Sequence, residues 1–150
     1  MATAAKKEER AEATLEIRRT IPAPRERVFE AWTQAKELDR WSAPSPMTPT
    51  AEVDLRVGGR YRIVMRGPDG AEHRVGGVYR TIDRPSRLVY TWKWEDSPMP
   101  DSVVTVEFHE RGKETEVVLR HEGLTDSESR GRHEHGWNAC LDNLVTIMTR

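Results

Sequence analysis

Residues 121–150 read HEGLTDSESRGRHEHGWNACLDNLVTIMTR, and this stretch decides the fold of the chain. Its apolar side chains recur at the spacing of one face of an α-helix, namely at Trp137, Leu141, Leu144, Val145 and Met148. Thr125 and Glu128 have the spacing of a capping box, in which each side chain caps a backbone N–H at the start of a helix. We therefore expect a helix that begins at Thr125 and runs for about 24 residues, or roughly 36 Å.

Upstream of this helix, alternating apolar and polar residues bounded by turn residues predict strands. The expected strands span residues 14–21, 53–57, 61–65, 75–82, 88–94, 104–108 and 117–119. Short helices are expected at residues 25–32 and 34–40, followed by a proline-rich loop at 42–49. Turn signals such as Gly67-Pro68-Asp69-Gly70 favour antiparallel hairpins, and Gly76-Gly77 predicts a bulge or bend within a strand.

This order of elements predicts an α+β fold, in which the long helix covers one face of an antiparallel sheet. Residues 14–150 are expected to form a single domain. Residues 1–13, which are rich in Ala, Lys and Glu, are expected to be a disordered leader.

The composition excludes several classes of protein. Charged residues make up 33% of the chain, yet the net charge is −1, so there is no basic excess for nucleic acid. No apolar run approaches the roughly 18–20 residues of a membrane span, and the N-terminal residues lack the apolar core of a signal peptide. A single cysteine, Cys140, excludes an internal disulfide. We expect a cytoplasmic protein in a reducing compartment.

An aromatic row is the first candidate for a binding site. Tyr90, Trp92 and Trp94 alternate along one strand, so they share one face of the sheet. They predict either ordinary core or the wall of an apolar pocket, and their polar tips suit a ligand with a few hydrogen-bonding groups. Trp41 and Met47 flank the proline-rich loop, where they either anchor a helix or lie over the mouth of the pocket.

Polar candidates for chemistry are His133, His121 and the strand-end Glu95, each of which has the chemistry of a general acid or base. The alternative is that the histidines are structural. His133 and His135 are two positions apart and diverge on a helix, so they do not form a metal pair. Cys140 is expected to be a buried small apolar residue. We predict no catalytic residue, no metal and no cofactor.

Four groups of residues together resemble a known superfamily. They are Ile21-Pro22-Ala23-Pro24 with Val28, Phe29 and Trp32; Leu38-Asp39-Arg40-Trp41; Gly58-Gly59-Arg60-Tyr61-Arg62 with Pro68-Asp69-Gly70; and His121-Glu122-Gly123-Leu124 with Gly136-Trp137 and Leu141-Asp142-Asn143-Leu144. Over about residues 14–149 the chain resembles the helix-grip superfamily of START domains, pollen-allergen-type proteins and polyketide cyclases (SRPBCC). Within it, the chain is most similar to homologues of the C-terminal domain of the activator of heat-shock protein 90 ATPase.

The resemblance implies a curved sheet of six to seven antiparallel strands, a long C-terminal helix packed across it, and a cavity between the two. We expect a non-catalytic binding protein whose partner is a hydrophobic small molecule, either lipid-like or aromatic. The expected cavity lining is Trp41, Met47, Tyr61, Ile63, Tyr79, Tyr90, Trp92, Trp94, His133, Trp137, Leu141, Leu144 and Met148. The alternatives are a chaperone cofactor that binds protein or self-associates, and a cyclase- or aromatase-like enzyme that uses His133, His121 or Glu95.

Overall fold

The computed structural model describes residues 14–149, so the leader expected at residues 1–13 and the final Arg150 lie outside the described part. The strands are β1 (Leu15–Ile21), β2 (Thr48–Val53), β3 (Arg60–Arg66), β4 (Glu72–Asp83), β5 (Arg87–Trp94), β6 (Ser102–Arg111) and β7 (Glu114–Glu122). The helices are α2 (Arg25–Thr33), α3 (Ala35–Leu38) and α4 (Ser127–Met148).

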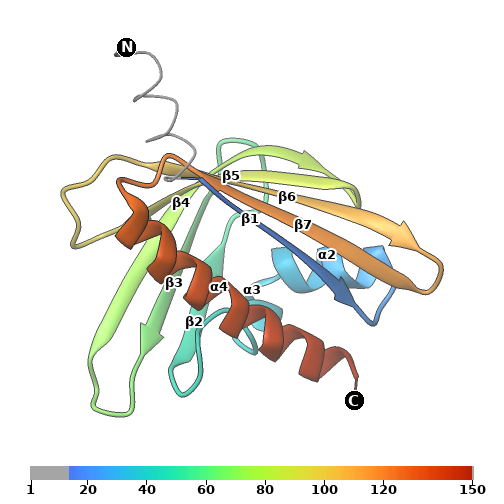
Figure 1. The fold of residues 1–150 in the computed structure, drawn as a ribbon, viewed down its shortest axis with the longest axis horizontal. Coiled ribbons are helices and arrows are strands. Elements are labelled where there is room, and N and C mark those ends of the chain that lie inside the picture. Colours follow the sequence, from blue (N-terminus) through green and yellow to red (C-terminus); the bar gives the residue numbers. More distant parts are fainter. Residues whose placement is uncertain (1–13, 150) are drawn as a thin grey trace.

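One antiparallel sheet contains all seven of these strands, in the order β1-β7-β6-β5-β4-β3-β2. The sheet curls into a half-barrel, and α4 runs diagonally across its concave side (Figure 1). Helix α2 contacts β6 and β7, while α3 lies beside β2. The prediction of an α+β helix-grip fold is confirmed. Among residues 14–149, no helix is both long and apolar enough to cross a bilayer.

The second strand differs from its prediction. It was expected at residues 53–57 after a loop at 42–49, but β2 runs over Thr48–Val53, and Val57 is 65% exposed in the turn that follows. The proline-rich composition argued against a strand, yet β2 lies at the edge of the sheet and pairs with β3 alone. An edge strand tolerates Pro49 because half of its backbone N–H groups face no neighbouring strand.

Strands β4 and β5 pair irregularly near Gly76-Gly77, the two glycines at which a bulge or bend was predicted. The register of the pair shifts between Tyr79 and Thr81, a few residues after these glycines. At Gly77 the two strands lie very close, since a Cβ atom there would be 1.9 Å from the carbonyl oxygen of Thr91. The same carbonyl accepts a hydrogen bond of 2.6 Å from the hydroxyl of Tyr61. A glycine is therefore required by the approach of the strands.

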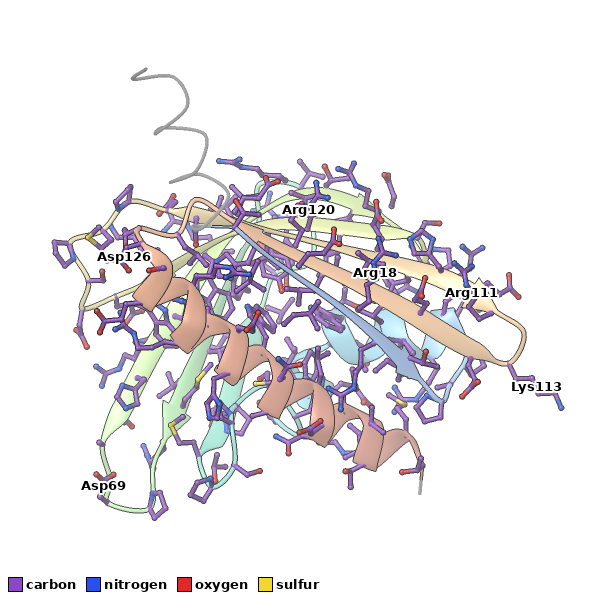
Figure 2. The ribbon with its side chains drawn as sticks, viewed as in Figure 1. Arg18, Asp69, Arg111, Lys113, Arg120 and Asp126 are labelled. Atoms are coloured by element: carbon purple, nitrogen blue, oxygen red, sulfur yellow. The ribbon has the colours of Figure 1, made fainter. Side chains whose placement is uncertain are left out.

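Helix α4 begins later than predicted. Its N-cap is Asp126 rather than Thr125, and the Asp126 carboxylate accepts a hydrogen bond of 2.8 Å from the backbone N–H of Ser129. Figure 2 shows Asp126 at the start of the helix, where this carboxylate also faces the positive end of the helix dipole. Aspartate caps a helix as well as threonine does, so the sequence alone did not distinguish these neighbours.

Replacing Asp126 with alanine is expected to lower the free energy of unfolding by about 1 kcal/mol, because a backbone N–H of the first turn loses its acceptor. Urea denaturation measures this loss. Asp126→Asn is the matched control, since asparagine keeps a capping oxygen and is expected to retain most of the stability. An equal loss in both variants would show that the cap contributes nothing through its hydrogen bond.

Candidate functional site

A pocket of about 290 Å³ lies between the first half of α4 and the concave face of the sheet. Strands β3, β4 and β5 form one wall, α4 forms another, and α3 with the loop after it closes a third side. The lining residues are Trp32, Leu38, Trp41, Ser42, Pro44, Met47, Tyr61, Ile63, Met65, His73, Tyr79, Tyr90, Trp92, Trp94, Arg132, His133, Gly136, Trp137 and Cys140.

The aromatic residues of the chain are sorted by type around this pocket. All five tryptophans and all three tyrosines of the sequence line it. The two phenylalanines, Phe29 and Phe108, do not; they pack edge to face in the core, with ring centroids 5.2 Å apart. Aromatic side chains with a polar tip have therefore gathered at the pocket, while the purely apolar ones fill the core.

Ten of the residues expected from the sequence line the pocket: Trp41, Met47, Tyr61, Ile63, Tyr79, Tyr90, Trp92, Trp94, His133 and Trp137. The other three, Leu141, Leu144 and Met148, lie further along α4 and outside the lining. Leu141 and Leu144 are fully buried in the core and Met148 packs against it. This part of α4 packs against β1, where Asp142 pairs with Arg19.

Sequence reasoning did not name Trp32, Leu38, Ser42, Pro44, Met65, His73, Arg132, Gly136 or Cys140 as lining residues. A signal existed for two of them. Trp32 continues the predicted stripe of Val28 and Phe29, and Cys140 follows Trp137 on the inward side of the last helix. The loop residues had no comparable signal, because their positions depend on how the chain folds back over the sheet.

His121 is enclosed at the end of β7 and is 0% exposed. Its Nδ1 accepts a hydrogen bond of 3.1 Å from the indole of Trp137. The Ser102 hydroxyl donates to the carbonyl of Trp92 at 3.0 Å, so it accepts from His121 Nε2 at 2.7 Å. Burial, with a smaller effect from the nearby His133, lowers the pKa of His121 to about 3. The imidazole is therefore neutral, and both of its nitrogens are occupied.

His133 forms a second pair of the same kind. Its Nε2 accepts a hydrogen bond of 3.0 Å from the indole of Trp94, and its Nδ1 donates to the carbonyl of Ser129 at 2.7 Å. Burial lowers the pKa of His133 as well. The lone pair that a general base would use is thus held by a tryptophan.

The remaining candidates for chemistry are also occupied or inactive. Glu95 is partly exposed and binds Arg62 through two hydrogen bonds of 2.6 and 3.2 Å, which lower the pKa of the carboxyl group. Cys140 is buried, and desolvation raises the pKa of its thiol to about 12, so the nucleophilic thiolate does not form. Within residues 14–149, no three His, Cys, Asp or Glu side chains are grouped to hold a metal ion.

Three of the lining residues are tyrosines, and their rings lie together. The rings of Tyr61, Tyr79 and Tyr90 pack against one another with centroids 5.2–6.1 Å apart. Burial raises the pKa of all three, so each remains a protonated phenol. The Tyr90 oxygen accepts a hydrogen bond of 3.1 Å from the indole of Trp32.

The curled antiparallel sheet, with short helices after its first strand and a long C-terminal helix across it, defines a domain of the helix-grip class. A model of the family described as activator of Hsp90 ATPase homolog 1-like protein matches residues 22–149, and the chain belongs to this family. A comparison with curated proteins found no match.

Several solved bacterial structures share the fold. A protein from Chromobacterium violaceum is 26% identical, with a TM-score of 0.85 over 92% of this chain and 98% of its own. The AHSA1 protein from Silicibacter pomeroyi is 25% identical, with a TM-score of 0.83 over 91% of this chain and 98% of its own. CalU16 from Micromonospora echinospora is 27% identical, with a TM-score of 0.69 over 90% of this chain and 75% of its own.

Proposed function

We propose that this protein is a binding module that holds a compact aromatic or other apolar small molecule in the pocket beneath α4. The observation that carries this proposal is the sorting of the aromatic residues. All eight residues with a ring and a polar tip line one pocket, and both phenylalanines lie elsewhere. A core that only had to be filled would not separate the two kinds, since phenylalanine fills a core without needing a hydrogen-bond partner.

Binding is better supported than catalysis. The three acid–base candidates predicted from the sequence have their hydrogen-bonding atoms committed: His121 to Ser102 and Trp137, His133 to Trp94 and Ser129, and Glu95 to Arg62. A general base must reach the proton that it removes with a free lone pair. These contacts instead fix the walls of the pocket in place.

The size of the pocket favours a small ligand. Its volume of about 290 Å³ lies at the lower end of the usual range for ligand sites, roughly 300–1,000 Å³. A flat ring system fits such a space better than a long acyl chain. The buried free thiol of Cys140 agrees with the reducing cytoplasm as the place of action.

A pair of glycine substitutions tests this function. Gly136 lines the pocket from α4, and its Cβ position is 3.9 Å from the ring of Pro44, so a leucine side chain there is expected to extend into the opening. Gly136→Leu is expected to weaken the binding of naphthalene by about tenfold or more, because overpacking costs typically 1–3 kcal/mol. Tryptophan emission is the readout, since every tryptophan of the chain lines the pocket.

Gly131→Leu is the matched control. Gly131 lies on the same helix, is exposed, and has nothing within 4 Å of its Cβ position, so this variant makes the same chemical change away from the pocket. It is expected to bind naphthalene as the parent protein does. Equal weakening in both variants, or an emission spectrum that no aromatic compound alters, would contradict the proposed function.

The family description favours a second function, action on the chaperone Hsp90 through a protein interface. Leu55 and Val57 are exposed apolar side chains in the turn between β2 and β3, where they are available to a protein partner. The test is the ATPase rate of purified Hsp90 with increasing amounts of this protein and of its Leu55→Ser/Val57→Ser variant. If neither the parent protein nor the variant changes the ATPase rate of Hsp90, this second function is wrong.

A further inference from the structure

Several hydrogen-bond donors around the pocket have no acceptor within the described residues 14–149. We propose that the ligand is an aromatic carbonyl compound, such as a ketone or a quinone, whose oxygen accepts hydrogen bonds from Tyr79 and Tyr90. This inference rests on the proposed function and names the chemical class of ligand for that same pocket.

The tyrosine hydroxyls carry the first part of the argument. Tyr79 is 3% exposed and lines the pocket, and its hydroxyl has no hydrogen bond to any residue in the described range 14–149. Tyr90 accepts a hydrogen bond from Trp32, so the proton of its own hydroxyl is left to donate. Tyr61 differs, because its proton goes to the carbonyl of Thr91 at 2.6 Å. Two of the three neighbouring phenols thus keep an unassigned proton.

The tryptophans carry the second part. Four indole N–H groups have acceptors within the protein: Trp32 with Tyr90, Trp41 with the carbonyl of Ala31, Trp94 with His133, and Trp137 with His121. Trp92 is 7% exposed, and its N–H is buried with no acceptor among residues 14–149. A buried N–H without a partner is unfavourable, since it has given up its bonds to water. A further donor without an acceptor therefore belongs to a residue of the pocket wall.

The two buried histidines beside the pocket have no acceptor left for a ligand. The ring lone pairs of His133 and His121 are held by Trp94 and Trp137. His73, the other histidine of the lining, lies at an exposed position. The charged side chain in the lining is Arg132, and among the described residues no carboxylate lines the pocket. With no carboxylate among the described lining residues to pair with a cation, ammonium ions are disfavoured even though aromatic walls can attract them.

A carbonyl oxygen is the group that complements these donors. It has two lone pairs and can accept from two hydroxyls at once, while the ring system to which it is conjugated packs against the aromatic walls. A hydrocarbon of the same shape would leave both phenolic protons buried and unsatisfied. We therefore expect the protein to prefer a carbonyl compound over a hydrocarbon of equal shape. This preference is expected to depend on the hydroxyl of Tyr79.

Three bicyclic compounds of nearly equal shape test the inference: indanone, which has a carbonyl acceptor; indane, which has no polar group; and indole, which has a donor. Their affinities are measured by two-dimensional NMR titration of the full chain, in which each indole N–H of the protein gives its own signal. Indanone is expected to bind about fivefold to tenfold more tightly than indane, the ratio that one or two net hydrogen bonds produce, and more tightly than indole.

Tyr79→Phe removes the free hydroxyl and keeps the ring. It is expected to reduce the preference for indanone over indane to about twofold or less. Thr33→Val is the control, because it removes a buried hydroxyl that donates to the carbonyl of Phe29 at 2.9 Å outside the pocket lining. This control is expected to keep the full preference. A shift of the Trp92 indole signal with indanone, absent with indane, would further support an oxygen placed beside that ring.

The possible results separate this inference from the proposed function. If indane and indanone bind equally, or if Tyr79→Phe keeps the preference, the carbonyl class is wrong while the pocket remains a binding site. Tighter binding of trimethylphenylammonium than of indanone would likewise overturn the carbonyl class in favour of a cation. If none of these compounds binds, the proposed function fails together with the inference.

Discussion

Replacement of Gly77 by alanine is expected to destabilise the protein by at least about 3 kcal/mol, the upper end of the usual cost of overpacking. The added Cβ atom would lie 1.9 Å from the carbonyl oxygen of Thr91 and 2.6 Å from its carbonyl carbon. These are backbone atoms, so no side chain can rotate to make room. The strands β4 and β5 would have to separate, which would also disturb the bonds that Tyr61 and Val78 make to Thr91.

Thermal denaturation measures this effect, and a loss of 3 kcal/mol corresponds to a melting temperature lower by about 10 °C for a domain of this size. Gly131→Ala is the control, since its Cβ position on α4 is open and alanine favours a helix over glycine by about 1 kcal/mol. That variant is expected to be as stable as the parent or more stable. If Gly77→Ala has the same melting temperature as the parent protein, then β4 and β5 do not approach as closely as described.

Acidification from pH 7 to pH 5 is expected to lower the free energy of unfolding by about 2 kcal/mol through His121 alone. The pKa of His121 is about 3 in the folded protein, against about 6.5 for an ordinary histidine in the unfolded chain. Above pH 6.5 both states are neutral and nothing is lost. Below it, the unfolded chain takes up a proton that the folded protein refuses, so stability falls until the pH reaches about 3. His133, with its lowered pKa, acts in the same direction.

Urea denaturation at a series of pH values measures this loss. His121→Gln is the informative variant, because an amide can accept from Trp137 and donate to Ser102 without titrating. It is expected to be less stable at pH 7 and to show a flatter dependence on pH. His135→Gln, at an exposed position of α4, provides the comparison with a histidine that is not buried. An unchanged slope in His121→Gln would mean that another group causes the acid sensitivity.

The fold could be predicted from the sequence wherever the spacing of apolar residues corresponds directly to which side chains are buried. The stripe of Trp137, Leu141 and Leu144 is buried as predicted, and the alternation of Tyr90 and Trp92 identified the inner face of β5. The failure at β2 has a physical cause. The prolines were taken to exclude a strand, which holds for a strand that is paired on both sides. The sequence alone does not show that this strand lies at the edge of the sheet, where proline is tolerated.

The candidate site was less accessible to such reasoning. The aromatic walls of the pocket could be predicted from the alternation of residues along single strands. The tryptophan–histidine hydrogen bonds that hold these walls, however, join distant parts of the chain. Trp94 and His133 are 39 positions apart, and Trp137 and His121 are 16 apart. No local spacing relates them. The exposed or buried state of each histidine, which decides between a base and a structural group, was set by packing that only the folded chain contains.

The arrangement of the strands has a consequence for synthesis of the protein. Strand β1 pairs with β7, and the ion pair of Glu16 with Arg120 joins residues 104 positions apart. The helix that closes the pocket follows β7 along the chain. A nascent chain still missing α4 would thus present its concave aromatic face to water and to chaperones. The ability to hold a ligand would appear only after α4 has left the ribosome and packed across the sheet.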